Sequence, residues 1–194
     1  MTGVKPIFKD EYNKTSGVII TLKDSDIQKA KEFTNKVIKV KEKERHHKTD
    51  SKSVYKRFLT GTLGELALEE LLGIKVVNWN VGKSTTFKNP DLKHAGFDVG
   101  IKTVNYGMFP LVDKNPQSAE IINIKLSDNE ICMLGMVTVE DLRVYTDDAL
   151  LFDKNAKQRK TAFWNLSTAK SFNSVASLRY LHNSDSWSKI IDWD

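Results

Sequence analysis

The stretch that decides the fold is residues 97–104, FDVGIKTV, in which apolar residues alternate with polar or small ones. In a strand, successive side chains point to opposite faces of the sheet. Asp98, Gly100 and Lys102 would therefore share one face, and the apolar residues between them would share the other. The stretch predicts a strand that presents an acid and a base on the same face.

Further polar groups surround this strand in the sequence. Asp91 lies at the loop-to-strand entry, and Glu65 lies upstream in a helical pattern. Carboxylates hold Mg²⁺, which prefers oxygen ligands and keeps waters that can attack a phosphodiester. A lysine at the same site can polarise the attacking water or contact the phosphate. Together with Asp98 and Lys102, these acids predict a metal-dependent phosphodiesterase site. Glu65 could equally be an ordinary solvent-facing helix acid.

Three polar residues near the strand are weaker candidates. His94 lies between the two acids, where contact with phosphate or solvent is favoured over a metal or water-positioning role. Thr103 and Asn105 follow the lysine, and each is either a contact to the DNA backbone or an ordinary strand end.

The residues upstream predict two helices. A β-branched run at 18–22 predicts a strand, and apolar residues at three- and four-residue spacing then predict a helix from 24 to about 44. A second helix is expected over 53–72, and Gly73 ends it. Gly61 and Gly64 inside that helix indicate either the close approach of another backbone or a break near Thr60.

The residues downstream predict a hairpin and a short helix. A strand is expected at 74–79, and two more at 120–126 and 130–138 are joined by a tight turn. Thr138 is expected to cap a short helix that begins at Val139. The aromatic segment 139–194 is expected to pack on the body of the protein.

The basic residues are concentrated in one segment. The chain of 194 residues carries a net charge of +5, and residues 39–57, with eight basic and three acidic residues, carry an equal excess. This segment is either a solvated helix face or a surface that contacts DNA phosphates. The candidate DNA-binding residues are Lys39, Lys41, Lys43, Arg45, His46, His47, Lys48, Lys52, Lys56 and Arg57. A second basic cluster consists of Lys154, Lys157, Arg159 and Lys160.

The composition fits one soluble α/β domain over residues 1–194. Apolar residues make up 40% of the chain and charged residues 28%. We expect a basic helical part at 24–72, a catalytic sheet at 74–138 and a C-terminal packing segment at 139–194. No apolar run reaches the roughly 18 residues of a membrane span, and no signal-peptide core follows the first charges. We therefore expect a cytoplasmic protein. The single cysteine, Cys132, excludes a disulfide within the chain.

Three short stretches together resemble the PD-(D/E)XK nuclease superfamily. They are residues 61–67 (GTLGELA), 89–91 (NPD) and 97–103 (FDVGIKT), and the resemblance spans about residues 55 to 140. It implies a restriction-endonuclease-like fold, in which helices flank a mixed central sheet. It also implies Mg²⁺-dependent cleavage of DNA, with Glu65 as the helix glutamate and Lys102 as the catalytic lysine.

The sequence departs from that pattern at Gly100, where an acid is expected two residues before the lysine. In one interpretation of the motif, Asp91 is its first acid and Asp98 substitutes for the second. In the other, Asp98 is the first acid and another residue, for which Glu120 is the candidate, supplies the second. We favour Asp98 and Lys102 as the fixed core, completed by Asp91 in preference to Glu120.

The sequence thus predicts a Mg²⁺-dependent endonuclease of double-stranded DNA, of the type II restriction kind. A homodimer is expected, because a cut in both strands at one site is simplest for a two-fold dimer. The alternatives are a catalytically degenerate DNA-binding module of the same fold and an unrelated α/β protein.

Overall fold

The computed structural model describes residues 17–41, 51–81, 90–151 and 159–191. Its helices and strands follow one another in this order: β1 (Val18–Thr21), α2 (Asp24–Lys41), α3 (Ser51–Leu72), β2 (Val99–Asn105), β3 (Leu111–Asp113), β4 (Ala119–Lys125), β5 (Glu130–Val137), α4 (Val139–Val144), β6 (Thr146–Asp147), β7 (Lys160–Phe163) and α5 (Val175–Ile191).

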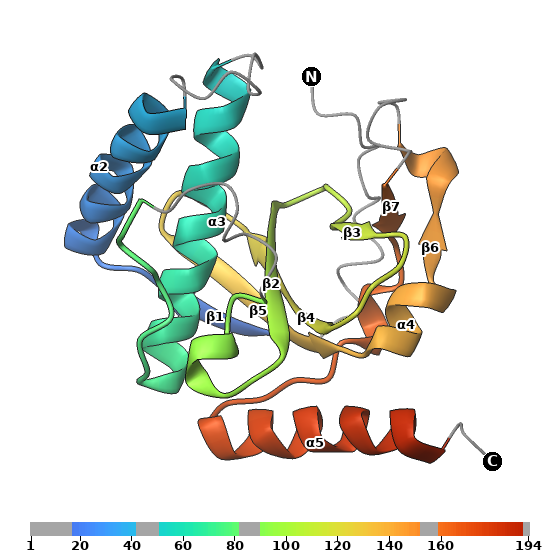
Figure 1. Cartoon of the computed structure of the whole chain (residues 1–194). Helices are drawn as coiled ribbons and strands as arrows, with labels where there is room; N and C mark the ends of the chain where they lie inside the picture. The colour runs from blue at the N-terminus through green and yellow to red at the C-terminus, as the bar shows by residue number, and fades with distance from the viewer. Residues whose placement is uncertain (1–16, 42–50, 82–89, 152–158, 192–194) are drawn as a thin grey trace.

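The strands form two sheets. The larger sheet has the order β1-β5-β4-β2, in which β2 runs parallel to β4 while the other neighbours are antiparallel. The smaller sheet is antiparallel, with the order β3-β7-β6. Figure 1 shows α2 and α3 on one side of the larger sheet and the smaller sheet with α4 on the other. The expected mixed α/β architecture, a mixed sheet flanked by helices, is therefore confirmed.

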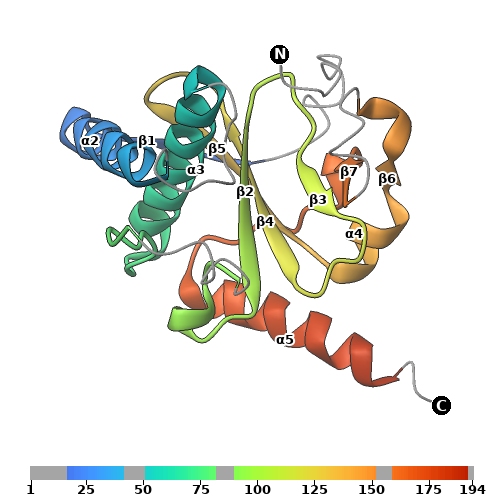
Figure 2. The same ribbon diagram turned by 45° about the horizontal axis from the view of Figure 1, so that its top comes forward.

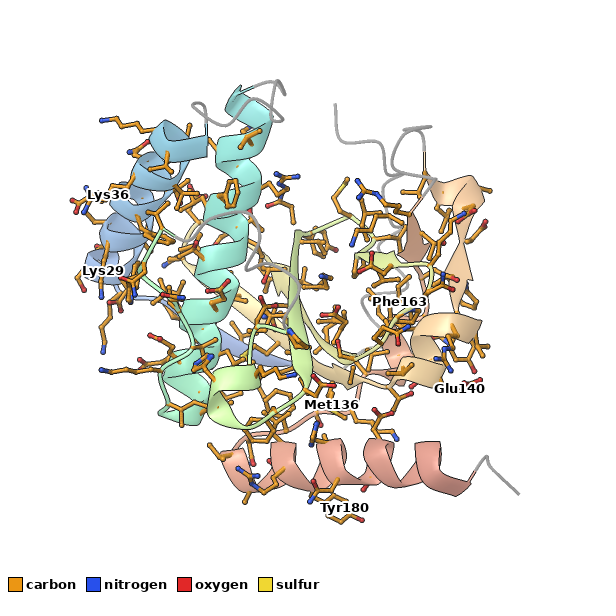
Figure 3. All side chains as sticks on the ribbon, in the orientation of Figure 1. Lys29, Lys36, Met136, Glu140, Phe163 and Tyr180 are labelled. Carbon is orange, nitrogen blue, oxygen red and sulfur yellow. The ribbon has the colours of Figure 1, made fainter. Side chains whose placement is uncertain are left out.

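Each face of the larger sheet covers its own hydrophobic core. Leu68 of α3 packs with Ile121 in the core beneath the helices. Ile122 and Ile124 of the same strand pack with Phe163 in the core beneath the smaller sheet. Alternation along β4 explains this division, because neighbouring residues of a strand point to opposite faces. Figure 3 labels Phe163 on the side of the smaller sheet.

The two long helices pack against each other and against the sheet. In α2 the buried side chains of Ile27, Ala30 and Val37 form the predicted apolar stripe. Lys29 and Lys36 lie on the outer side of this helix (Figure 3). The expected end of this helix near Glu44 lies outside the described residues.

Helix α3 runs unbroken and comes very close to β2. A Cβ atom added at Gly64 would overlap the Thr103 side chain, with only 2.7 Å left to the Thr103 Cβ. Glycine at this position therefore permits the contact between helix and sheet. Of the two alternatives that the glycines raised, the structure has close approach at Gly64 and no break near Thr60.

The strand expected at 74–79 is not formed. The backbone N–H groups of Val76 and Val77 donate hydrogen bonds to the Glu69 carboxylate, at 2.7 and 2.9 Å. A helix side chain thus satisfies the donors that a neighbouring strand would otherwise bind. The apolar residues Val76 and Val77 are still buried in the core, which is why their pattern resembles a strand.

The predicted hairpin and helix cap are confirmed. Strands β4 and β5 pair antiparallel, with a register shift between Ile122 and Asn123. The Thr138 hydroxyl accepts a hydrogen bond from the Asp141 N–H at 3.1 Å, at the start of α4. Among the described helices, none is both long enough and apolar enough to cross a membrane.

The segment after β5 contains more regular structure than its sequence indicated. Strands β6 and β7 complete the smaller sheet, and α5 packs on the body of the protein through Leu178. Figure 2 shows α5 below the larger sheet. Tyr180 is 73% exposed on the outer side of this helix (Figure 3).

Candidate active site

Lys102 and Glu120 form an ion pair across two neighbouring strands. The Lys102 Nζ lies 3.5 Å from the Glu120 Oε1, and their side chains are 29% and 12% exposed. Lys102 lies on β2, and Glu120 on β4 is the register partner of Gly100. Because β2 and β4 are parallel, a residue that lies 20 positions downstream of Gly100 becomes its direct neighbour.

The carboxylate of Glu120 lies over Gly100. A Cβ atom at position 100 would overlap Glu120 Oε2 and would lie 2.8 Å from its carboxyl carbon. The space for a side chain two residues before the lysine is therefore filled by an acid from the adjacent strand. Glycine leaves this space open to the carboxylate, which a larger residue would displace.

One oxygen of Glu120 lacks a partner. Its Oε2 is buried and has no hydrogen bond within the part of the chain that the structure describes. Burial raises the pKa of Glu120 to about 7, Lys102 opposes this shift, and Asp91 adds to it. A buried carboxylate oxygen without a hydrogen-bond donor is stabilised by a proton or by a cation.

Asp91 lies beside the outer edge of β2. Its Oδ2 accepts a hydrogen bond of 2.7 Å from the backbone N–H of Ile101. Strand β2 is at the end of its sheet, so this N–H bonds to a side chain instead of another strand. The hydrogen bond holds the Asp91 carboxylate beside the edge of the sheet, where groups on both faces are within reach.

Glu65 reaches the same edge from α3. Burial, together with the negative charges of Asp91 and Glu69, raises its pKa to about 8. Asp91 also acts on the pKa values of Lys102 and Glu120. The Asp91 charge therefore couples Glu65 on the helix side to the ion pair on the other side.

The Lys102 ammonium is stabilised by its neighbours. Burial lowers its pKa, but the charges of Glu120 and Asp91 outweigh this effect, so the net shift is upward. Asp113 of β3 contributes in the same direction. Lys102 is consequently a charged hydrogen-bond donor at neutral pH and not a general base.

These residues fit a magnesium ion held by few protein ligands. Within the described ranges, no three His, Cys, Asp or Glu side chains are placed to hold one ion together. Mg²⁺ is commonly bound through one or two carboxylates and keeps several waters. Asp91 and Glu120 supply two carboxylates, and the partnerless Glu120 oxygen has the hard anionic character that this ion prefers.

Asp98 lies apart from these residues. It is exposed and lies one residue before β2 begins, and its backbone N–H donates to His182 Nε2 of α5 at 3.2 Å. An extended chain rises about 3.3 Å per residue, which places Lys102 about 13 Å further along. Asp98 and Lys102, which we favoured as the centre of the site, are thus not brought together. Asp91 and Glu120 are the acids of the candidate site that act on the lysine.

The weaker candidates occupy different environments. His94 Nε2 is 2.9 Å from the Lys75 carbonyl oxygen, in an exposed position. The Thr103 hydroxyl is buried beneath α3 at Gly64, so of the two alternatives for this residue the structure agrees with an ordinary strand position. Asn105 is exposed at the end of β2.

Part of the predicted basic surface is described. Lys39 of α2 is exposed, as are Lys56 and Arg57 in the first turns of α3. Arg57 precedes Glu65 by eight residues, or about 12 Å along a helix. For the remaining candidates, either the whole residue or its side chain lies outside what the structure describes. They are Lys41, Lys43, Arg45, His46, His47, Lys48 and Lys52.

Sequence reasoning missed the contribution of the smaller sheet. Lys160 of β7 lowers the pKa of Glu120, and Asp113 of β3 acts on Lys102, although neither residue lies in the three stretches that carry the resemblance. The basic cluster at 154–160 was the only signal for Lys160.

A separate surface pocket of about 380 Å³ lies between β1 and the C-terminal end of α3, lined in part by Glu69.

The chain matches no protein-family model, no curated protein and no solved structure. The fold and the site therefore define it as a mixed α/β protein with an acid-lysine site at the edge of its larger sheet.

Proposed function

We propose that this protein is a Mg²⁺-dependent endonuclease that hydrolyses phosphodiester bonds of double-stranded DNA. The observation that carries the proposal is the Glu120 carboxylate over Gly100, beside Lys102. It supplies from β4 the acid that the PD-(D/E)XK pattern has two residues before its lysine. A restriction-type enzyme with this motif is the class that these residues support best.

Each residue would have a distinct role in the reaction. The Lys102 ammonium donates to the scissile phosphate or to the attacking water, since its raised pKa keeps it protonated. Glu65, with a pKa of about 8, holds a proton at neutral pH and can exchange it beside Asp91. Asp91 is held in position by the hydrogen bond that it accepts from the Ile101 N–H.

Asp91 and Glu120 would hold the Mg²⁺ ion. When bound, the ion neutralises charge on the phosphate and supplies a water of lowered pKa. The exposed Lys39, Lys56 and Arg57 would contact the DNA backbone, where basic side chains release counterions. A homodimer would place two such sites on the two strands.

One observation favours the alternative, a DNA-binding module without catalysis. The Lys102 Nζ already lies 3.5 Å from Glu120 Oε1, so the two side chains neutralise each other without a metal ion. Such a module would bind DNA through the same basic residues, and the Lys102–Glu120 pair would be a structural ion pair.

The decisive experiment is cleavage of unmethylated plasmid and phage DNA with Mg²⁺ or with chelator. The wild-type protein is compared with Lys102→Ala and with Lys125→Ala. Lys125 is a matched control, because it lies on β4 and forms its own ion pair with Asp128 at 2.7 Å. Cleavage should need both Mg²⁺ and Lys102, while Lys102→Ala keeps its affinity for DNA. Cleavage by Lys102→Ala, or no cleavage by the wild type alongside DNA binding, would contradict the proposed activity.

A further inference from the structure

A second ion pair lies opposite the first, on the smaller sheet. The Lys160 Nζ of β7 lies 2.8 Å from the Asp113 Oδ1 of β3. The two residues are register partners in the antiparallel pair β3–β7. Neither residue has a role in the function proposed above.

The first ion pair lies on the face of the larger sheet that is turned toward the smaller sheet. Gly100, Lys102 and Val104 alternate along β2 and so share a face, and Val104 packs in the core beneath the smaller sheet. In β4, Glu120 shares its face with Ile122, which belongs to the same core. Figures 1 and 2 both show β3 and β7 on this side of β2, away from α3.

The charges of the two pairs act on each other. Lys160 lowers the pKa of Glu120, and Asp113 raises the pKa of Lys102. Each member of the first pair therefore lies within electrostatic range of the oppositely charged member of the second. A phosphate group bound at Lys102 would lie in the field of Lys160 as well.

The second pair is exposed to solvent. The side chains of Lys160 and Asp113 are 37% and 56% exposed, and exposed pairs of this kind contribute little to stability. The lysine can thus exchange its partner at little cost. A DNA phosphate, which is a strong acceptor of charge-assisted hydrogen bonds, is a suitable replacement.

We propose that Lys160 binds a DNA phosphate next to the one that is cleaved, and that Asp113 holds this lysine in position until DNA displaces it. This inference rests on the proposed function, since it adds the smaller sheet to the same substrate site. Arg159, which is exposed and adjacent to Lys160, extends the basic edge of β7. The DNA strand would then lie between the edge of the larger sheet and the strands β3 and β7.

The test is the salt dependence of DNA binding by the full chain. Fluorescence anisotropy with a labelled DNA duplex, in chelator, is measured between about 50 and 200 mM salt. Lys160→Ala should weaken binding about tenfold and reduce the slope of log K against log salt by about one, the effect of one lost phosphate contact. Lys160→Arg should retain the wild-type slope, because it keeps the charge.

Asp113→Asn provides a second variant with an effect in the opposite direction. It frees Lys160 from its partner and should tighten binding about two- to fivefold. The matched controls are Lys125→Ala and Asp128→Asn, which break an ion pair at the other end of β4, about 17 Å from Glu120 along the strand. Neither control should change the slope.

The outcomes separate this inference from the proposed function. If the wild type cleaves DNA while Lys160→Ala has the same salt slope as Lys125→Ala, the role of Lys160 is overturned and the nuclease proposal stands. Weaker binding by both Lys160→Ala and Asp113→Asn would show a structural ion pair and would also overturn it. If the wild type neither binds nor cleaves DNA, both proposals fail.

Discussion

Glu120 lies opposite Gly100 in the parallel pair β2–β4, and its carboxylate fills the space that a side chain at position 100 would need. The acid that accompanies Lys102 thus comes from a neighbouring strand. Since the two positions share one space, a carboxylate can come from either of them but not from both at once.

The first prediction concerns a carboxylate moved from position 120 to position 100. Glu120→Ala should reduce Mg²⁺-dependent cleavage about 100-fold or more, because several kcal/mol of transition-state stabilisation depend on this carboxylate. Adding Gly100→Asp to Glu120→Ala should restore part of the rate, while Gly100→Asp alone should be impaired by the clash with Glu120. Initial rates of plasmid cleavage measure each step.

The double variant Gly100→Ala with Glu120→Ala is its control, since it fills the space without a carboxylate. Equal rates for the two double variants, both folded by circular dichroism, would show that position 100 cannot supply the acid.

The second prediction compares two glycines of the same helix. Gly64→Ala should lower the free energy of unfolding by about 1 to 3 kcal/mol, because the new methyl group overlaps Thr103. Gly61→Ala should raise it by about 0.5 to 1 kcal/mol, because nothing lies within 4 Å and alanine favours the helix. Denaturant unfolding measures both values.

Adding Thr103→Ala to Gly64→Ala should recover part of the lost stability, since the hydroxyl and methyl groups of Thr103 are among the overlapping atoms. Equal effects of the two glycine substitutions would contradict the close approach of α3 to β2.

The third prediction concerns pH and Glu65, whose pKa is raised from 4.5 to about 8. Between these values the folded protein holds a proton that the unfolded chain has released, so stability falls as pH rises through this window. Glu65→Gln removes this dependence. Its Tm advantage over the wild type should therefore grow by about 8 to 16 °C between pH 4.5 and 8, or about 4 kcal/mol.

Thermal unfolding of the two proteins across this range provides the measurement. The slope that Glu120 contributes is common to both proteins and cancels in the comparison. Parallel curves would show that Glu65 titrates near its ordinary pKa.

The fourth prediction separates the two roles of Asp91. Asp91→Asn keeps an oxygen that can accept from the Ile101 N–H, whereas Asp91→Ala loses this hydrogen bond and should be less stable by about 1 kcal/mol. Both variants should lose cleavage, because both remove the charge. Thermal unfolding with and without Mg²⁺ tests the metal directly.

Mg²⁺ should raise the Tm of the wild type and leave that of Asp91→Asn unchanged, since ligand binding stabilises only the form that binds. The same rise in both proteins would place the ion elsewhere.

Local sequence patterns were enough to predict most of the helices and strands and the residue types of the site. The periodicity of apolar residues placed β1, α2 and α3, and the turn between β4 and β5 placed the hairpin. The Thr138 cap was predictable because its partner lies three residues away. Lys102, Glu65, Asp91 and Glu120 were all singled out from short stretches, because a strand or a helix needs only its own residues to define its faces.

The acids that lie beside the lysine could not be predicted from local patterns, because strand pairing brings them there. Asp98 shares an alternation pattern with Lys102 but lies before β2 begins, whereas Glu120 is brought to Gly100 by strand pairing 20 positions apart. The loop at 74–79 forms because the Glu69 side chain of the preceding helix binds its backbone, and the pair Lys160–Asp113 forms through strand pairing 47 positions apart. Local patterns encode the faces of an element, while the register between elements is set by the packing of the whole core.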